Sequence, residues 1–149
     1  MKRRAFLLGL GALPLATGLR ANPGTPQVLV YKTPSCGCCT GWVEHMKASG
    51  FSVTAKDVAD TTPERKRLGM PDRFAACHTA SVGGYVIEGH VPAPEVRRLL
   101  ESRPQAIGLA VLGMPLGSPG MEVDNRLDPY EVFIVDRRGQ PSVFARYPK

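Results

Sequence analysis

The sequence lacks the motifs that identify several common classes of enzyme. It contains no glycine-rich phosphate-binding loop, no arrangement of Ser, His and Asp for nucleophilic catalysis, and no paired carboxylates for acid–base hydrolysis. The sequence therefore gives no support to phosphoryl, acyl or glycosyl transfer. Internal repeats and low-complexity tracts are also absent, and 149 residues are enough for one domain with a single hydrophobic core.

A long hydrophobic run is missing as well. The apolar stretch over residues 5–16 is shorter than the roughly 20 residues that a membrane-spanning helix needs. Basic residues precede it, and the small residue Ala21 follows it, so residues 1–21 are predicted to be a secretory signal, with an uncleaved anchor as the alternative. The Arg pair at positions 3 and 4 suits the twin-arginine type. We expect a periplasmic protein without membrane contact after cleavage, beginning with a linker at 22–27.

No basic stripe remains once the predicted signal is set aside. The chain has 19 Lys and Arg against 13 Asp and Glu, and residues 1–21 hold four of the basic residues and no acidic one. The rest therefore carries 15 against 13, a net charge of +2. Nucleic-acid binding is excluded on this ground, because it requires a concentrated positive surface.

The order of secondary-structure signals predicts an α/β fold of the thioredoxin-like type: a βαβ unit, then a β-hairpin and a closing helix. This domain is expected over residues 28–123, with an ordered loop at 104–129 and an added C-terminal hairpin within 124–149. The predicted strands are 28–31, 51–55, 79–82, 85–88, 132–135 and 142–145, and the predicted helices are 38–49, 62–69 and 94–102.

Three of the four cysteines lie within four residues, in the turn Cys36-Gly37-Cys38-Cys39 between the first predicted strand and the first predicted helix. A disulfide across so short a loop stabilises a fold little through chain entropy, so the crowding indicates chemistry. The amino end of a helix favours the thiolate, which is the form that attacks disulfides and binds metals.

This turn has two main interpretations. Cys36 and Cys39 form a CxxC pair, as in thiol–disulfide oxidoreductases. The additional Cys38 favours a metal site, because a third thiol invites unwanted disulfide exchange but adds a soft ligand for Cu(I) or Zn(II). Adjacent side chains at a helix start diverge by about 100°, which favours bridging thiolates in a polynuclear copper cluster over a single ion. A zinc-stabilised structural module, or a buried disulfide beside a spare thiol, are the remaining alternatives.

The fourth cysteine, Cys77, precedes the predicted strand 79–82 together with His78. In thioredoxin-like folds the loop at this place faces the cysteine turn and usually carries a cis-proline, which this sequence lacks. We expect Cys77 to be a fourth thiolate ligand. His78 points to the opposite side of an extended segment, so it is a weaker candidate for a ligand and is expected instead to donate a hydrogen bond that supports the ligands.

Three further residues are weaker candidates for ligands. His90 directly follows the second strand of the predicted hairpin, and Met114 and Met121 lie in a segment rich in Gly and Pro. Thioethers bind Cu(I) at any pH, although methionine more commonly packs. His45 is expected to be solvated on the polar side of the first helix.

Four motifs of this chain resemble one known family. Residues 31–39, 77–80, 84–93 and 113–122 are similar to the domain-of-unknown-function family 411, whose members include periplasmic CopG-type copper-resistance proteins. The resemblance covers roughly residues 28–123. It implies a thioredoxin-like fold, copper binding at the CxCC cysteines, a role in periplasmic copper tolerance and interconversion of Cu(I) and Cu(II). The implied partners are copper ions and other periplasmic copper-handling proteins.

Overall fold

The computed structural model describes residue 24 and residues 26–149. The predicted secretory signal therefore lies outside the described residues, as does half of the predicted linker. Within the described part, no helix is sufficiently long and apolar to cross a membrane.

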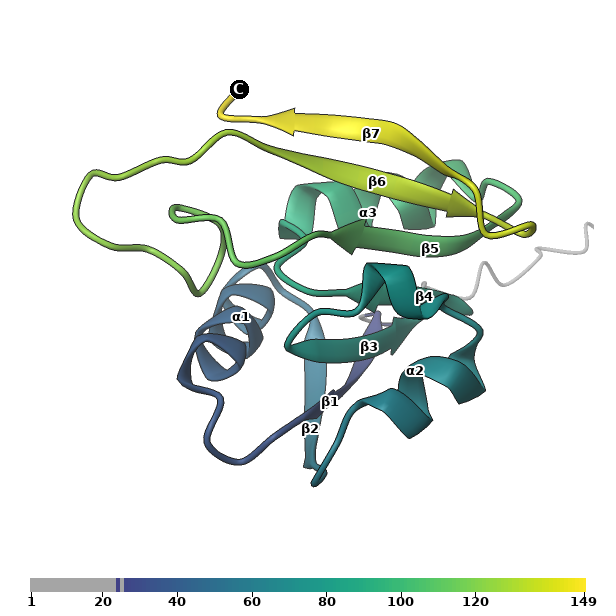
Figure 1. Cartoon of the computed structure of the whole chain (residues 1–149), viewed down its shortest axis with the longest axis horizontal. Coiled ribbons are helices and arrows are strands. Elements are labelled where there is room, and N and C mark those ends of the chain that lie inside the picture. Colours follow the sequence, from purple (N-terminus) through teal and green to yellow (C-terminus); the bar gives the residue numbers. More distant parts are fainter. Residues whose placement is uncertain (1–23, 25) are drawn as a thin grey trace, which may run out of the picture.

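The described chain forms a mixed α/β fold around one seven-stranded sheet with the strand order β2-β1-β3-β4-β5-β6-β7 (Figure 1). The strands are β1 (Gln27–Lys32), β2 (Ser52–Asp57), β3 (His78–Val82), β4 (Tyr85–Glu88), β5 (Ala106–Val111), β6 (Tyr130–Asp136) and β7 (Pro141–Tyr147). The helices are α1 (Gly37–Ala48), α2 (Thr62–Leu68) and α3 (Ala93–Ser102), with a short 3-10 turn, η1 (Asp72–Phe74).

The two faces of the sheet are covered by different helices. Side chains of α1 and α3 belong to one buried cluster, which includes Ile87 of β4. The neighbouring residue Val86 belongs to a second cluster with Phe74 of η1, against which Leu68 of α2 packs. Successive residues of a strand point to opposite faces, so α1 and α3 cover one face and α2 with η1 the other.

The first half of the fold follows local sequence signals closely. Strands β1 and β2 are connected by α1 and pair in parallel, while β1 pairs antiparallel with β3. Strands β3 and β4 form the predicted hairpin, and both turn residues, Gly83 and Gly84, have the positive φ that a two-residue turn requires. Helix α2 ends at Gly69, which adopts the left-handed conformation typical of helix ends.

The prediction of a continuous loop over 104–129 is wrong, because residues 106–111 form β5 in the middle of the sheet. This strand pairs in parallel with β4 and antiparallel with β6. Gly108 lies directly against the Val86 carbonyl, so its missing side chain is what allows this approach. The terminal hairpin of β6 and β7 is present and extends the sheet beyond β5.

Candidate metal centre

The cysteine turn is fixed by the end of β1 and the start of α1. The Cys36 N–H donates to the Thr33 carbonyl at 3.2 Å, which closes the turn after the strand. Cys36 is also the N-cap of α1, where its Sγ atom accepts from the Cys39 N–H at 3.3 Å. The sulfur therefore occupies the position at which an N-terminal helix cap satisfies a free amide. Cys39 is fully buried, whereas Cys36 and Cys38 are half-buried.

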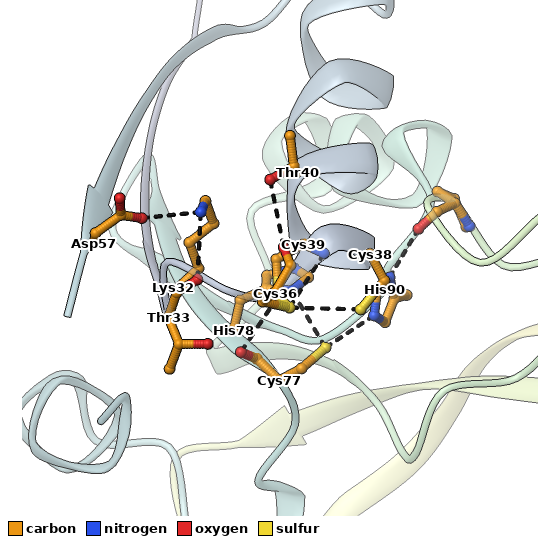
Figure 2. The surroundings of a disulfide bond; sticks show 11 residues. Lys32, Thr33, Cys36, Cys38, Cys39, Thr40, Asp57, Cys77, His78 and His90 are labelled. Carbon is orange, nitrogen blue, oxygen red and sulfur yellow. Dashed lines mark hydrogen bonds and ion pairs between the residues drawn. A yellow bond between two sulfur atoms is a disulfide. The ribbon is translucent and has the colours of Figure 1, made fainter. Parts of the chain in front are cut away.

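Cys36 and Cys39 form a disulfide bond, with their Cα atoms 5.3 Å apart (Figure 2). Cys38 and Cys77 are free thiols. The Cys38 Sγ atom lies 3.5 Å from the Cys36 Sγ atom, in contact with the disulfide. The turn thus contains an oxidised CxxC pair, Cys36 and Cys39, and one additional free thiol, Cys38, which an ordinary CxxC motif lacks.

The loop before β3 brings Cys77 against the cysteine turn, as the sequence predicts. The Sγ atoms of the four cysteines all lie within 4.8 Å of one another. The expected divergence of Cys38 and Cys39 therefore does not separate their sulfur atoms from the rest. One turn of helix and one facing loop together create a four-sulfur cluster, which we call the sulfur cluster.

His90 extends this arrangement from the far end of the β3–β4 hairpin. Its Nε2 atom lies 2.9 Å from the Cys77 Sγ atom (Figure 2). Its Nδ1 atom lies 2.8 Å from the Pro119 carbonyl. Because a carbonyl only accepts, Nδ1 carries the hydrogen and donates it. The Nε2 lone pair of the neutral ring then faces Cys77, and a backbone contact of this kind orients metal-binding imidazoles in proteins.

His78 lies in the interior between the sulfur cluster and the hydrophobic core. Its ring packs against Trp42 at a centroid distance of 4.5 Å and meets His90 edge-on at 5.1 Å. Its Nδ1 atom is 3.7 Å from the Cys77 Sγ atom, and its Nε2 atom is buried without a hydrogen-bond partner among the described residues. Burial, aided by the neighbouring His90, lowers the pKa of His78 to about 3. The ring is therefore neutral at physiological pH.

The environment of Cys77 favours the neutral thiol. Burial raises the pKa of Cys77 to about 12, and the adjacent Cys38 adds to this effect. This is the opposite of what a helix amino end does to a thiol. A metal cation that replaces the proton would remove the penalty, because it compensates the buried negative charge of the thiolate.

The two methionines have different surroundings in the structure. Met114 is 56% exposed and lines an open pocket of about 490 Å³ with Leu112, Tyr130 and other residues of the β5–β6 region. Met121 is half-buried and directly follows Gly120, whose backbone lies against the Cys38 carbonyl of α1. The connection from β5 to β6, seen beside α1 in Figure 1, therefore contacts the helix that carries the cysteines.

The expectation that His45 is solvated is wrong. The ring is half-buried, and its Nε2 atom accepts from the Ala93 N–H at 3.0 Å, at the first residue of α3. Burial lowers the pKa of His45. The periodicity of α1 alone did not reveal this contact, because it depends on where α3 begins in space.

Two residues beside the site cannot be recognised from sequence patterns. Pro119 orients His90 through its carbonyl group, which no side-chain pattern can indicate. Glu88 is fully buried at the end of β4 and accepts hydrogen bonds from the residues that flank Cys77 and His78. The only available signal was a carboxylate at the end of an apolar strand, where charged residues are seldom buried without a partner.

Comparisons with known proteins identify relatives of this chain. A family model described as "Protein of unknown function, DUF411" matches residues 74–121. Two solved structures, titled copper resistance protein copG in forms 2 and 1, are each 44% identical and cover 83% of this chain, with TM-scores of 0.79 and 0.78. The matches span 99% and 98% of those chains, while no curated protein sequence matches. The chain therefore belongs to the DUF411 family, together with these copper resistance proteins.

Proposed function

We propose that this protein binds Cu(I) at the sulfur cluster and serves copper tolerance in the periplasm. The observation that carries the proposal is the convergence of four cysteine Sγ atoms within 4.8 Å. Soft thiolate ligands favour Cu(I). The two similar solved structures are named copper resistance proteins, which supports copper as the cargo.

The full ligand set requires reduction of the Cys36–Cys39 disulfide. An external dithiol can supply the two electrons and two protons and is itself oxidised to a disulfide, and the resulting Cys36 and Cys39 thiols can then exchange their protons for metal. Four thiolates this close together can each bridge two ions, so we propose a polynuclear Cu(I) cluster. The neutral Nε2 atom of His90, 2.9 Å from the Cys77 Sγ atom, is the proposed nitrogen ligand at its edge.

The remaining proposed donors are His78, Met114 and Met121. His78 is included because its buried Nε2 atom has no partner among the described residues. The methionines are included because both belong to the segment that carries Pro119 onto His90. Their thioethers are neutral, so copper binding there would not depend on pH.

A second candidate function is thiol–disulfide exchange, or redox conversion of copper, at Cys36 and Cys39. The disulfide between them favours it. Oxidation of this dithiol to the disulfide releases two electrons and two protons and can reduce two Cu(II) ions to Cu(I). The placement of the pair after β1 and at the start of α1 supports a thioredoxin-like unit spanning β1 to α3, which we propose on the strand order β2-β1-β3-β4.

Anaerobic titration of the reduced, metal-free protein with Cu(I) in the presence of a competing chelator tests the proposal. We expect more than one Cu(I) per chain in the wild type and a lower number in Cys38→Ser. One tightly bound Zn(II) with no uptake of copper would contradict the copper function. Unchanged stoichiometry in Cys38→Ser would remove Cys38 from the site.

The oxidoreductase candidate has a separate test in metal-free protein. Insulin reduction that is lost in Cys36→Ser and retained in Cys38→Ser would favour it, because Cys38 is outside the disulfide. Absence of insulin reduction in the wild type would leave copper binding as the function of the turn.

A further inference from the structure

We propose that Glu88 is the positioning residue that holds the Cys77–His78 segment against the cysteine turn. Its carboxyl group accepts hydrogen bonds from Ala76, which precedes Cys77, and from Thr79, which follows His78. The copper readout described below depends on the proposed function, whereas the structural readout does not.

Glu88 forms hydrogen bonds with the residues on either side of the two candidate ligands, Cys77 and His78. Its Oε1 atom accepts from the Ala76 N–H at 2.9 Å, and its Oε2 atom accepts from the Thr79 hydroxyl at 2.7 Å. Thr79 and Glu88 are directly paired across the β3–β4 ladder, so the second contact is short and direct.

The part of this segment that precedes β3 has no regular structure of its own. Residues 75–77 connect η1 to β3 without a helix or a strand. The segment also lacks the proline that stiffens this loop in thioredoxin-like folds. Glu88 supplies the acceptor for the Ala76 N–H in this irregular stretch.

Close packing reinforces the hydrogen bonds. Gly89 has a φ of +72°, and a Cβ atom on it would lie 2.8 Å from the Ala76 Cβ atom. The absence of a side chain therefore allows the segment to approach the end of β4. The Gly89 N–H donates to the His78 carbonyl at 3.0 Å, which adds a backbone contact on the same side.

Arg65 of α2 lies beside the buried carboxyl group of Glu88. The Arg65 side chain is only 5% exposed, and its Nη1 atom lies 3.7 Å from the Glu88 Oε1 atom. Arg65 also bonds Asp72 of η1 at 3.3 Å, so the network reaches both ends of the connection between α2 and β3. A buried carboxylate without such partners would be strongly unfavourable, and an apolar residue would suffice for packing alone.

Glu88→Leu removes both acceptors and is the primary variant. The matched control is Glu95→Leu, because Glu95 of α3 is also buried and accepts from Tyr147 and Lys149, none of which belongs to the sulfur cluster. We expect Glu88→Leu to lower the Cu(I) affinity about 10- to 100-fold, the usual effect of removing a residue that orients metal ligands. Glu95→Leu should lower the melting temperature while leaving the Cu(I) affinity unchanged.

Glu88→Gln is the conservative variant, since its amide oxygen can still accept from the Ala76 N–H. Its Cu(I) affinity should lie closer to that of the wild type than to that of Glu88→Leu. Equal Cu(I) affinities of Glu88→Leu and Glu95→Leu at matched stability would overturn the proposal. If Glu88→Leu does not fold, Thr79→Val and Thr79→Ser replace it. A lower Cu(I) affinity in Thr79→Val than in Thr79→Ser would support the positioning role of Glu88. Equal Cu(I) affinities of these two variants would overturn it.

Hydrogen exchange of the Ala76 amide in metal-free protein separates this inference from the copper function. We expect exchange at least about tenfold faster in Glu88→Leu than in the wild type and in Glu95→Leu, because the amide loses its acceptor. An unchanged exchange rate would overturn the role of Glu88 even if copper binds. Failure of the wild type to bind Cu(I), with faster exchange in Glu88→Leu, would refute the proposed function and retain the positioning role.

Discussion

The Nε2 atom of His90 lies 2.9 Å from the Sγ atom of Cys77, although the two residues are separated by the whole β3–β4 hairpin. The hairpin brings them together because Cys77 precedes its first strand and His90 follows its second. Cys77 belongs both to the sulfur cluster and to a second group of close donor atoms, in which the ligand atoms of Cys77, His78 and His90 lie within 4.8 Å of one another.

Replacement of His90 by Gln tests whether this contact contributes to copper binding. We expect the Cu(I) affinity of the reduced protein to fall about tenfold or more, because the Nε2 lone pair is lost from the edge of the sulfur cluster. Chelator competition measures the effect. His45→Gln is the matched control, since His45 bonds the start of α3 and belongs to neither group of close donor atoms. Similar losses in both variants would assign the effect to general destabilisation.

The arrangement of the cysteines predicts a specific pattern of alkylation. In unfolded protein that has not been reduced, only Cys38 and Cys77 should be labelled, and all four cysteines after reduction. In native metal-free protein Cys77 should react more slowly than Cys38, because burial raises its pKa to about 12 and the thiolate is the reactive form. Peptide mass spectrometry measures both results. Labelling of Cys36 or Cys39 without reductant would contradict the disulfide.

The secondary structure that sequence patterns predict well is the part that local signals determine. Gly83 and Gly84 identify the β3–β4 turn, and Gly69 marks the end of α2. Strand β5 is not predicted from the sequence because its Ala and Gly residues have low strand propensity. Its stability comes from pairing with a neighbouring strand on both edges. Gly108 is required there by the Val86 backbone of another strand, which no local pattern can show.

The candidate metal centre likewise has residues that the sequence predicts and residues that only the completed fold brings to it. The cysteine turn and the facing position of Cys77 follow from chain order alone, since the end of β1, the start of α1 and the start of β3 meet at one end of paired strands. The acceptors that orient the site come from elsewhere in the chain. Pro119 and Glu88 act through contacts 29 and 12 residues away, so they depend on the completed fold.

Substitution of Gly120 tests how the β5–β6 connection supports the site. Gly120 has a φ of +85°, and a Cβ atom would collide with the Cys38 carbonyl and the Trp42 amide of α1. Gly120→Ala should displace the connection, weaken the contact of Pro119 with His90 and lower both stability and Cu(I) affinity. Gly113→Ala is the control: its φ is +70°, but a Cβ atom there meets nothing within 4 Å.

Both variants incur the backbone strain of a left-handed alanine, about 1–2 kcal/mol. Only Gly120→Ala adds the collision, so its free energy of unfolding should be lower than that of Gly113→Ala. Urea denaturation and chelator competition provide the two measurements. Equal effects of the two substitutions would show that the connection does not depend on close contact with α1.

The pH dependence of stability in metal-free protein should reflect two buried groups with opposite signs. Burial lowers the pKa of His78 to about 3, so below about pH 6.5 the unfolded chain binds a proton that the folded protein does not, and stability is lost as the pH falls. Burial raises the pKa of Glu88 to about 7, so the folded protein holds a proton that the unfolded chain has released, and stability is lost as the pH rises from about 4.5 to 7.

Single variants separate the two effects. Relative to the wild type, His78→Phe should gain up to about 1.4 kcal/mol of unfolding free energy for each pH unit below 6.5, because it removes the histidine that resists protonation. Glu88→Gln should show the opposite slope, gaining relative stability as the pH rises from about 4.5 to 7. Urea denaturation at pH 5, 6 and 7 measures both slopes. Parallel pH profiles of wild type and His78→Phe would mean that folding does not change the pKa of His78, which would contradict a buried ring that stays neutral below pH 6.5.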